Sequence, residues 1–304
     1  MSKVSVIITT FNREKHIGCA VESVLNQSYK DFELLILDNS STDNTRKIVE
    51  GIKDSRIRYI IHPAMSISSA RNLGVRESKG EFIAFLDDDD EWLPAKIEKQ
   101  LKVFNNKDTA LVYGGFEKID SDGKNIGNHR PVLKGKILND LLSLKDDFTA
   151  SASNPMLRKS VIIELGLYNE KVLTGEDYEL YLRIAKKYLI DYTPEIVLKI
   201  KTHYGSRLGD RLKDAAELEL MLLDDYCEIF DNDGRLKSFY LQRIGGKYIR
   251  IGENKLGRSY IIKSIRSYSL NLIAYAQYLV SFLNIKVYRF LHDKYLKIQR
   301  KLRS

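Results

Sequence analysis

The sequence predicts an α/β protein in which a doubly wound, mostly parallel sheet is followed by a helical appendage. In the first third of the chain, short apolar runs rich in β-branched residues alternate with stretches of helical spacing. The apolar runs are nearly continuous, which is typical of parallel strands that are covered on both faces. After Gly209 the pattern is almost entirely helical, with breaks at residues 231–234 and 252–255. We therefore expect two domains, residues 1–209 and residues 210–304.

Strands and helices alternate at the start of the chain. The strands are expected at residues 4–9, 32–37, 56–61 and 81–86, and the helices at residues 14–26, 40–52 and 65–77. The first helix places Ile17, Val21 and Val24 on one face. The second begins with hydroxyl residues, which favour helix N-termini. This rhythm indicates strand–helix–strand units with right-handed crossovers.

The second part of the expected sheet is less regular. Further helices are expected at residues 94–104, 160–165 and 175–187, and further strands at residues 110–119 and 154–158. Residues 120–128 are rich in Gly, Asp and Asn, which predicts a turn or loop. Residues 190–201 predict short strands interrupted by Pro194.

The composition narrows the class of protein. Of the 304 residues, 43% are hydrophobic and 30% charged, as in ordinary soluble proteins. The two cysteines form no metal-thiolate pattern, which fits a reducing compartment. The first apolar run is too short for a signal peptide, so we expect a cytoplasmic protein. The net charge of +8 is concentrated in residues 286–304, which carry seven Lys or Arg against one acid. We therefore expect no nucleic-acid partner.

The stretch from residue 81 to residue 92, EFIAFLDDDDEW, combines an apolar strand with five consecutive acids. Such acids repel one another unless something offsets their charge. In open α/β sheets, ligands bind beyond the carboxyl ends of the strands. Oxygen ligands suit Mg²⁺ and Mn²⁺, so we infer a divalent cation that in turn holds a diphosphate. The alternative is a solvated acidic turn that caps the next helix.

The first two strands also end in polar or aromatic residues. Thr9 and Phe11 end the first strand, and Asp38 and Asn39 end the second. Parallel strands place these ends together at the topological switch, where Phe11 can stack on a base and Asp38 can accept a hydrogen bond from it. The alternatives are strand-end packing for Thr9 and Phe11 and helix capping for Asp38. The chain has neither a GxGxxG nor a GxxxxGK[ST] motif.

Several motifs in order resemble the family 2 glycosyltransferases, which have the GT-A fold. The motifs are VSVIITTFNRE, ESVLNQSYKDFELLILDNSSTDNT, SSARNLGV, GEFIAFLDDDD and TGEDYELYLRI. The resemblance covers about residues 3 to 205, two-thirds of the chain. It implies an inverting sugar transfer from a nucleotide-diphosphate-sugar, aided by Mn²⁺ or Mg²⁺.

The resemblance also implies roles for residues in the nucleotide site. Thr9 and Phe11 match the start of the base pocket. Asp38 matches an acid that contacts uridine, which indicates a UDP-sugar. Asn39 stands where many relatives have a second Asp, and an amide can either donate or accept. Arg71 matches an arginine that reaches the nucleotide phosphates.

The acidic run matches the metal-binding DxD motif, in more than one register. We assign Asp89 as the direct metal ligand, Asp87 as its support and Asp88 as a ribose contact. Asp177 matches the catalytic base; its alternative role is an ordinary helix N-cap.

Elementary chemistry agrees with the roles that the resemblance implies. A cation offsets the charge that develops on the leaving diphosphate, and a single displacement needs one base and no protein nucleophile. A carboxylate at a helix N-terminus is ionised at neutral pH. His203 follows the last expected strand, and it can complete the cation's shell or remain a half-exposed strand-end histidine.

The sequence thus predicts a glycosyltransferase that modifies a saccharide or lipid-linked acceptor in cell-surface polysaccharide synthesis. Two other classes remain open: a Mg²⁺-dependent nucleotidyltransferase and a non-catalytic nucleotide-sugar binding protein. Residues 267–285 carry no charge and precede the basic run. They predict either an in-plane helix on the inner face of the cell membrane, as a peripheral membrane protein, or packing within the appendage or in a homo-oligomer.

Overall fold

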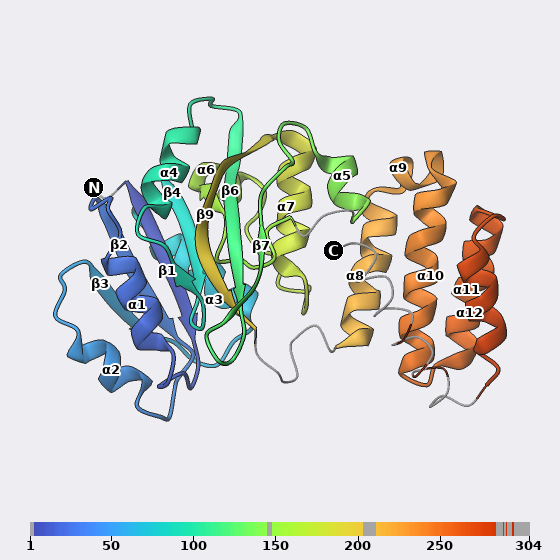
Figure 1. The fold of residues 1–304 in the computed structure, drawn as a ribbon, viewed down its shortest axis with the longest axis horizontal. Helices are drawn as coiled ribbons and strands as arrows, with labels where there is room; N and C mark the ends of the chain where they lie inside the picture. The colour runs from blue at the N-terminus through green and yellow to red at the C-terminus, as the bar shows by residue number, and fades with distance from the viewer. Residues whose placement is uncertain are drawn as a thin grey trace. The chain divides into compact units, whose positions relative to one another are not determined.

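The computed structural model describes residues 3–144, 148–202 and 211–283, together with residues 288, 290 and 294. The chain forms two compact units (Figure 1). The first comprises Met1–Lys171 and Glu176–Gly205, and the second Val172–Gly175 and Ser206–Ser304. The first unit holds a nine-stranded sheet in the order β3-β2-β1-β4-β8-β6-β9-β5, with β7 paired to β6. The second unit is helical.

The first half of the sheet is the parallel, doubly wound part. It consists of β1 (Val4–Thr10), β2 (Phe32–Asp38), β3 (Ile57–Ile61) and β4 (Phe82–Asp87), all parallel to their neighbours. The intervening helices are α1 (Ile17–Leu25), α2 (Thr45–Gly51) and α3 (Ile67–Glu77). Every one of these elements lies within two or three residues of its expected start, except α2, which begins five residues later.

Helices cover both faces of this half. Ile17 and Val21 of α1 belong to the same buried cluster as Val6 of β1. Strand residues that alternate with that set face α3: a Cβ on Gly74 would lie 2.7 Å from a methyl carbon of Ile7 and 2.9 Å from one of Leu37. Gly74 therefore lets α3 approach the sheet closely. With both faces buried, the strands need the continuous apolar sequences that they have.

The second half of the sheet is mixed, with both parallel and antiparallel pairs. Here β8 (Met156–Arg158) is antiparallel to both β4 and β6 (Thr109–Ile119), whereas β9 (Leu189–Lys201) is parallel to β6. The helices of this half are α4 (Lys96–Val103), α5 (Leu138–Leu142), α6 (Lys159–Glu164) and α7 (Glu176–Lys187). The short strand β8 lies within the strand that the sequence predicts at residues 154–158.

Three local expectations need correction. The loop expected at residues 120–128 instead contributes to a hairpin, because β7 (Asn125–His129) pairs with β6. The short strands expected at residues 190–201 are one strand, β9. Its pairing register shifts between Thr193 and Ile196, so Pro194 lies at an irregularity and removes no ladder hydrogen bond. A two-residue strand, β5 (Glu91–Trp92), follows the acidic run.

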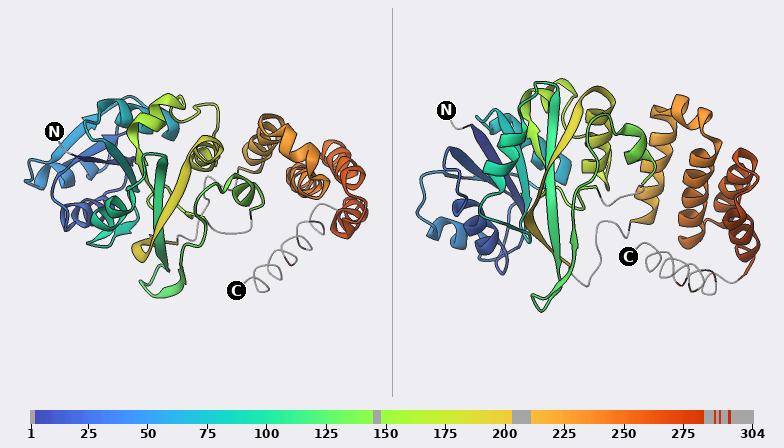
Figure 2. Two further views of the ribbon diagram at one scale, coloured as in Figure 1. Left: turned by 90° about the horizontal axis from the view of Figure 1, so that it is seen from above. Right: turned by 45° about the horizontal axis from the view of Figure 1, so that its top comes forward.

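The helical unit contains α8 (Leu212–Asp225), α9 (Cys227–Asn232), α10 (Gly234–Arg250), α11 (Asn254–Ser267) and α12 (Leu272–Val280). Its breaks fall where Gly and Asp interrupt the helical pattern. Helices α10, α11 and α12 lie side by side (Figure 2). A Cβ on Gly245 of α10 would lie 2.7 Å from the carbonyl oxygen of Gly257 of α11, which is a very close helix contact. Among the described residues, no helix is both long and apolar enough to span a bilayer.

Candidate active site

The acidic turn, residues 87–90, lies where β4 ends, beside the ends of β1 and β2. Thr9 is opposite Asp87 in the β1–β4 pairing, and Thr10 is opposite Asp38 in the β1–β2 pairing. The structure therefore brings together the strand ends whose polar residues the sequence singles out. This position, outside the carboxyl ends of parallel strands, is where open α/β sheets bind ligands.

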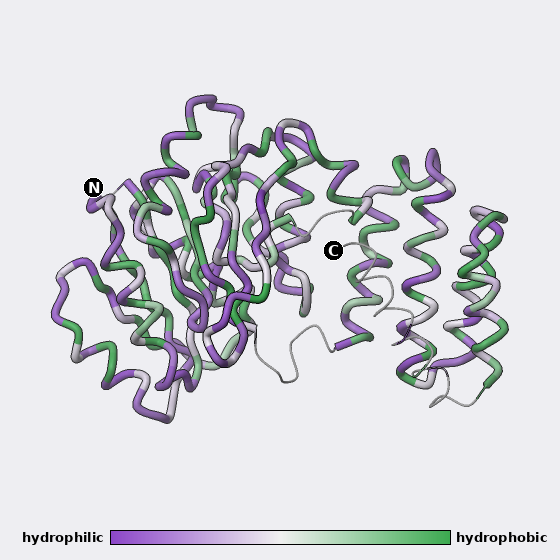
Figure 3. The backbone as a smooth tube through the Cα atoms, in the orientation of Figure 1, coloured by the Kyte–Doolittle hydropathy of each residue, from purple (hydrophilic) through white to green (hydrophobic). Residues whose placement is uncertain are grey.

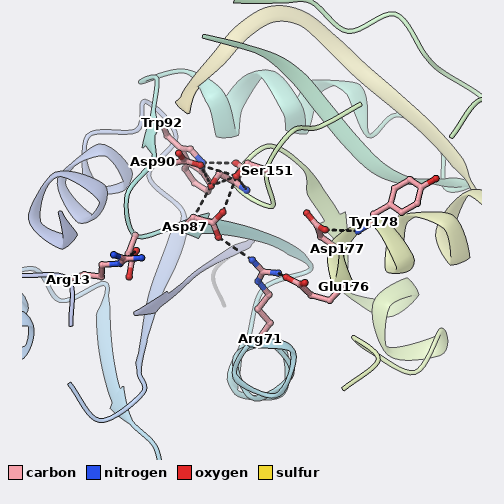
Figure 4. Close-up of polar contacts among 11 residues, drawn as sticks. Arg13, Arg71, Asp87, Asp90, Trp92, Ser151, Glu176, Asp177 and Tyr178 are labelled. Atoms are coloured by element: carbon pink, nitrogen blue, oxygen red, sulfur yellow. Dashed lines mark hydrogen bonds and ion pairs between the residues drawn. The ribbon is translucent and has the colours of Figure 1, made fainter. Parts of the chain in front are cut away.

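Two serines hold the acidic turn in place. Ser151 Oγ donates to both Asp87 (3.0 Å) and Asp90 (2.9 Å). Ser153 Oγ lies 2.6 Å from Asp90 and accepts a bond from the Asp87 backbone N–H. The Ser153 carbonyl oxygen in turn accepts from the buried Trp92 indole, at 2.8 Å. The segment just before β8 thus fixes the turn (Figure 4).

Arg71 connects this turn to α7. Its guanidinium is buried and donates to Asp87 (3.1 Å) and to Glu176 (2.7 Å), the first residue of α7. The rings of Phe85 and Tyr168 flank it, with centroids 5.7 and 5.4 Å away. Figure 4 shows the guanidinium between the two carboxylates. A single buried cation therefore joins a strand end to a helix start that is about ninety residues further along the chain.

Asp177 follows Glu176 at the N-terminal end of α7. The residue before this helix, Gly175, has a φ of 73°. Its carboxylate accepts from the backbone N–H of Tyr178, at 2.7 Å. Burial, and then the neighbouring Glu176 carboxylate, raise the pKa of Asp177 to about 6. A carboxyl with such a pKa is largely ionised at pH 7 and is also basic enough to take a proton.

The other aspartates are unequally placed. Asp88 is buried and accepts from Arg13 Nε at 3.1 Å; its burial and the nearby Asp89 and Asp87 raise its pKa to about 7. Burial and Asp87 raise the pKa of Asp90 to about 8. Asp87 and Asp89 are only half-buried. Four carboxylates are therefore crowded here, and those of Asp87 and Asp89 are the less buried ones.

The base-pocket candidates lie at the ends of β1 and β2. The Phe11 ring is 52% exposed, whereas Asp38 is 1% exposed. Asp38 accepts from the Ser41 backbone N–H at 2.8 Å and from the Tyr59 hydroxyl. The Asn39 side chain bonds to both the N–H and the carbonyl of Met65. Phe11 thus offers an open ring, and Asp38 and Asn39 shape the surrounding turns.

His203, which the sequence predicts for the site, lies outside the described residues. Three other residues contact the acidic turn but were not predicted from the sequence. Arg13, Ser151 and Ser153 contact the acidic turn although no local pattern marks them, because each acts across 60 or more residues of sequence. The acid at position 90 could have been found, since it belongs to the same acidic run.

The comparisons with known proteins define the class. The fold is that of the GT-A glycosyltransferases. A crystal structure of S. aureus TarS in complex with UDP-GlcNAc matches with a TM-score of 0.67 at 16% identity, covering 97% of this chain and 92% of that one. The mannosyltransferase PcManGT from Pyrobaculum calidifontis, in complex with GDP-Man and Mn²⁺, matches with a TM-score of 0.60 at 17% identity, covering 95% and 82%. The expected fold class is confirmed.

The family follows from sequence. Residues 5–166, more than half of the chain, match the model of glycosyl transferase family 2. The chain belongs to this family, as its motifs predict. An uncharacterized glycosyltransferase of Rickettsia felis is 33% identical over 208 residues, which is 67% of this chain and 34% of that protein.

A second relative has a more specific name. It is the Escherichia coli UDP-Glc:alpha-D-GlcNAc-diphosphoundecaprenol beta-1,3-glucosyltransferase WfgD. This protein is 38% identical over 120 residues, which is 39% of this chain and 47% of that protein. The matched part of the chain thus spans about a third of the length of the Rickettsia relative and less than half of WfgD.

Proposed function

We propose that this chain is an inverting, metal-dependent glycosyltransferase. It moves a sugar from a UDP-sugar to a lipid-linked or saccharide acceptor in cell-surface polysaccharide synthesis. The observation that carries the proposal is the pairing, through Arg71, of the acidic turn with the α7 N-terminus that bears Asp177. A donor-side group and an acceptor-side base must be held at a fixed separation, and this buried ion pair does so.

In the proposed reaction Asp177 accepts the proton of the acceptor hydroxyl while that oxygen attacks the anomeric carbon and the bond to the diphosphate breaks. General-base help of this kind is worth about 10² to 10⁴ in rate. Displacement in one step inverts the anomeric configuration and uses no protein nucleophile. Arg71 stays paired with Asp87 and Glu176, and we propose that its positive charge also attracts the donor diphosphate.

The residues of the turn fit a divalent cation. All donors are carboxylate oxygens, which Mg²⁺ and Mn²⁺ prefer, and the pKa values of Asp88 and Asp90 are raised by burial and then by the neighbouring aspartates. Within the described residues no three His, Cys, Asp or Glu converge on one metal position. Mg²⁺ needs only one or two carboxylates when substrate phosphates supply the rest. We propose Asp89 and Asp87 as ligands; a bound cation would neutralise charge on the leaving diphosphate.

The residues that we propose to bind the nucleotide are assigned from their positions at the ends of β1, β2 and β4. We propose that the base stacks on Phe11, that Thr9 and Asn39 border its pocket, and that Asp38 acts from the pocket floor. Asp88 remains the proposed ribose contact. The structural neighbours hold either UDP-GlcNAc or GDP-Man, whereas WfgD is named for UDP-glucose and a diphosphoundecaprenol acceptor. The sequence relative favours a UDP-sugar and a lipid-linked acceptor at the inner face of the cell membrane.

The test is an assay with Mn²⁺, a panel of nucleotide-sugars and a synthetic diphosphate-linked N-acetylglucosamine acceptor. We expect transfer from one UDP-sugar, release of UDP, and a product whose anomeric configuration, read by NMR, is opposite to that of the donor. Release of pyrophosphate would instead show a nucleotidyltransferase. Binding of UDP-sugars without turnover on a broad range of acceptors would show a non-catalytic binding protein.

A further inference from the structure

The outward side of α12 is apolar. In this helix and the turn that follows, the side chains of Leu272, Tyr275, Leu279, Phe282 and Leu283 are all exposed. Spacings of three and four residues place Leu272, Tyr275 and Leu279 on one side of α12, and Phe282 and Leu283 follow in the turn. We call these five residues the outer face of α12. Figure 3 colours much of this helix as hydrophobic.

Polar residues occupy the opposite side. Asn271 caps α12 by accepting from the Ala274 N–H, and its amide also donates to Gln242 of α10 at 3.0 Å. The Gln277 amide donates to the Tyr288 hydroxyl at 2.6 Å, and the carbonyl of Ser281, a buried residue, accepts from Arg258. The amides of Asn271 and Gln277 therefore bond to other residues of the helical unit.

This arrangement reverses the usual polarity of a surface helix. A helix that faces water places polar and charged residues outward and apolar residues toward the core. Here residues 267–285 contain no charge, and the amides of Asn271 and Gln277 bond within the helical unit. A contiguous exposed apolar surface of this kind marks a site that contacts a partner or a membrane.

Arg258 borders the outer face, and the sequence that follows this face is basic. The Arg258 guanidinium lies 4.5 Å from the centroid of the Phe282 ring, and the Lys294 ammonium lies 4.8 Å from that of the exposed Phe290 ring. In the sequence, residues 286–304 add seven Lys or Arg against one acid. Apolar side chains bordered by cations match the headgroup region of an anionic bilayer. A second copy of the chain would bring like charges together, which disfavours self-association through this face.

We propose that the outer face of α12 docks on an anionic membrane surface, with its apolar side chains at the headgroup boundary and the basic run against the lipid charges. One short helix gives weak binding alone, so apolar burial and charge act together. The inference does not depend on the proposed reaction, although it would bring the chain to the membrane where a lipid-linked acceptor lies.

The test is co-sedimentation of the full chain with vesicles, without any measurement of activity. We expect binding to vesicles of mixed phosphatidylcholine and phosphatidylglycerol, little binding to phosphatidylcholine alone, and weakening by high salt. The variant Leu272→Ser/Leu279→Ser loses side chains that are 75% and 70% exposed. We expect its partition coefficient to fall about tenfold or more. The matched control, Val132→Ser/Ile163→Ser, changes side chains that are 65% and 53% exposed in the other unit.

A second variant keeps the test decisive if the first folds poorly. The chain has one tryptophan, Trp92, which is buried. The variant Leu279→Trp therefore adds a reporter whose fluorescence should shift to shorter wavelength with the anionic vesicles. Equal vesicle binding by the outer-face variant and the control, or no binding by the unaltered chain, would overturn the proposal. So would a dimer, seen by light scattering, that the outer-face variant dissociates.

Discussion

Two buried charge clusters, one in each compact unit, have opposite compositions. In the first unit one guanidinium, that of Arg71, lies between the carboxylates of Asp87 and Glu176. In the helical unit one carboxylate, that of Glu219, accepts from Arg243 and from Lys247. Each cluster joins distant elements, β4 to α7 in one case and α8 to α10 in the other. They differ in the charges that surround them.

The charges around each cluster distinguish the proposed functional cluster at Arg71 from the structural cluster at Glu219. Near Arg71, burial and then neighbouring acids raise the pKa values of Asp88, Asp90 and Asp177 to about 7, 8 and 6. A bound cation would lower the repulsion among these carboxylates. Near Glu219 the excess is one positive charge, and burial lowers the pKa of Lys247 to about 8. Loss of one proton can relieve that excess without any ligand.

The largest expected effect in the first cluster is on the base. The substitution Asp177→Asn keeps the shape of the side chain but removes its basicity, so kcat should fall by about 10² to 10⁴. Donor affinity, measured by calorimetry with UDP, should stay unchanged because Asp177 acts on the acceptor. The exposed Glu217→Gln variant in the helical unit is the control. Turnover by Asp177→Asn at the unaltered rate would remove this residue as the base.

The second prediction concerns the cation. The substitution Asp89→Ala should abolish the gain in UDP affinity that Mn²⁺ produces, because the half-buried carboxylate proposed to bind the metal is gone. Calorimetry with and without Mn²⁺ measures that gain. The variant Asp122→Ala, which removes an exposed acid from the β6–β7 turn, should retain it. An Mn²⁺ effect of normal size in Asp89→Ala would assign the metal to other ligands.

The third prediction is the pH dependence of transfer. Because the base must be ionised, kcat/KM should fall about tenfold per pH unit below the Asp177 pKa of about 6. This fall is not unfolding caused by Asp177. Its folded-state pKa lies above the usual value of 3.8, so protonation as the pH falls adds to the free energy of unfolding. A rate profile flat down to pH 5, with a circular dichroism spectrum that does not change, would contradict the assignment.

The parallel half of the fold was predictable because its strands are continuous apolar runs and its helices carry clear periodicity. The mixed half of the sheet was harder to predict from the sequence. The β5 strand has two residues and α5 has five, which is too short for a periodic signal. The acidic turn and Asp177 were found from motifs. The serines that hold the turn were not, because Ser153 reaches Asp90 across 63 residues of sequence.

The roles of two features depended on tertiary contacts that no sequence pattern reveals. The resemblance implies that Arg71 reaches the donor phosphates, and in the structure its guanidinium donates to the carboxylates of Asp87 and Glu176. The polar residues of the uncharged stretch have helical spacing, but the spacing alone does not say which side faces water. The contacts of Asn271 with Gln242 and of Gln277 with Tyr288 show which way these amides face.

The smallest expected effect is in the helical unit. The substitution Glu219→Gln leaves Arg243 and the buried Lys247 without their carboxylate, so the free energy of unfolding should fall by about 1–2 kcal/mol. Urea unfolding followed by circular dichroism measures the loss. Glu217→Gln, on the exposed side of the same helix, should unfold like the unaltered chain. Transfer activity per folded molecule should not change, since this cluster has no part in the reaction. A kcat that falls in Glu219→Gln while stability is unchanged would show that the helical cluster also serves the active site, and the distinction between the two clusters would fail.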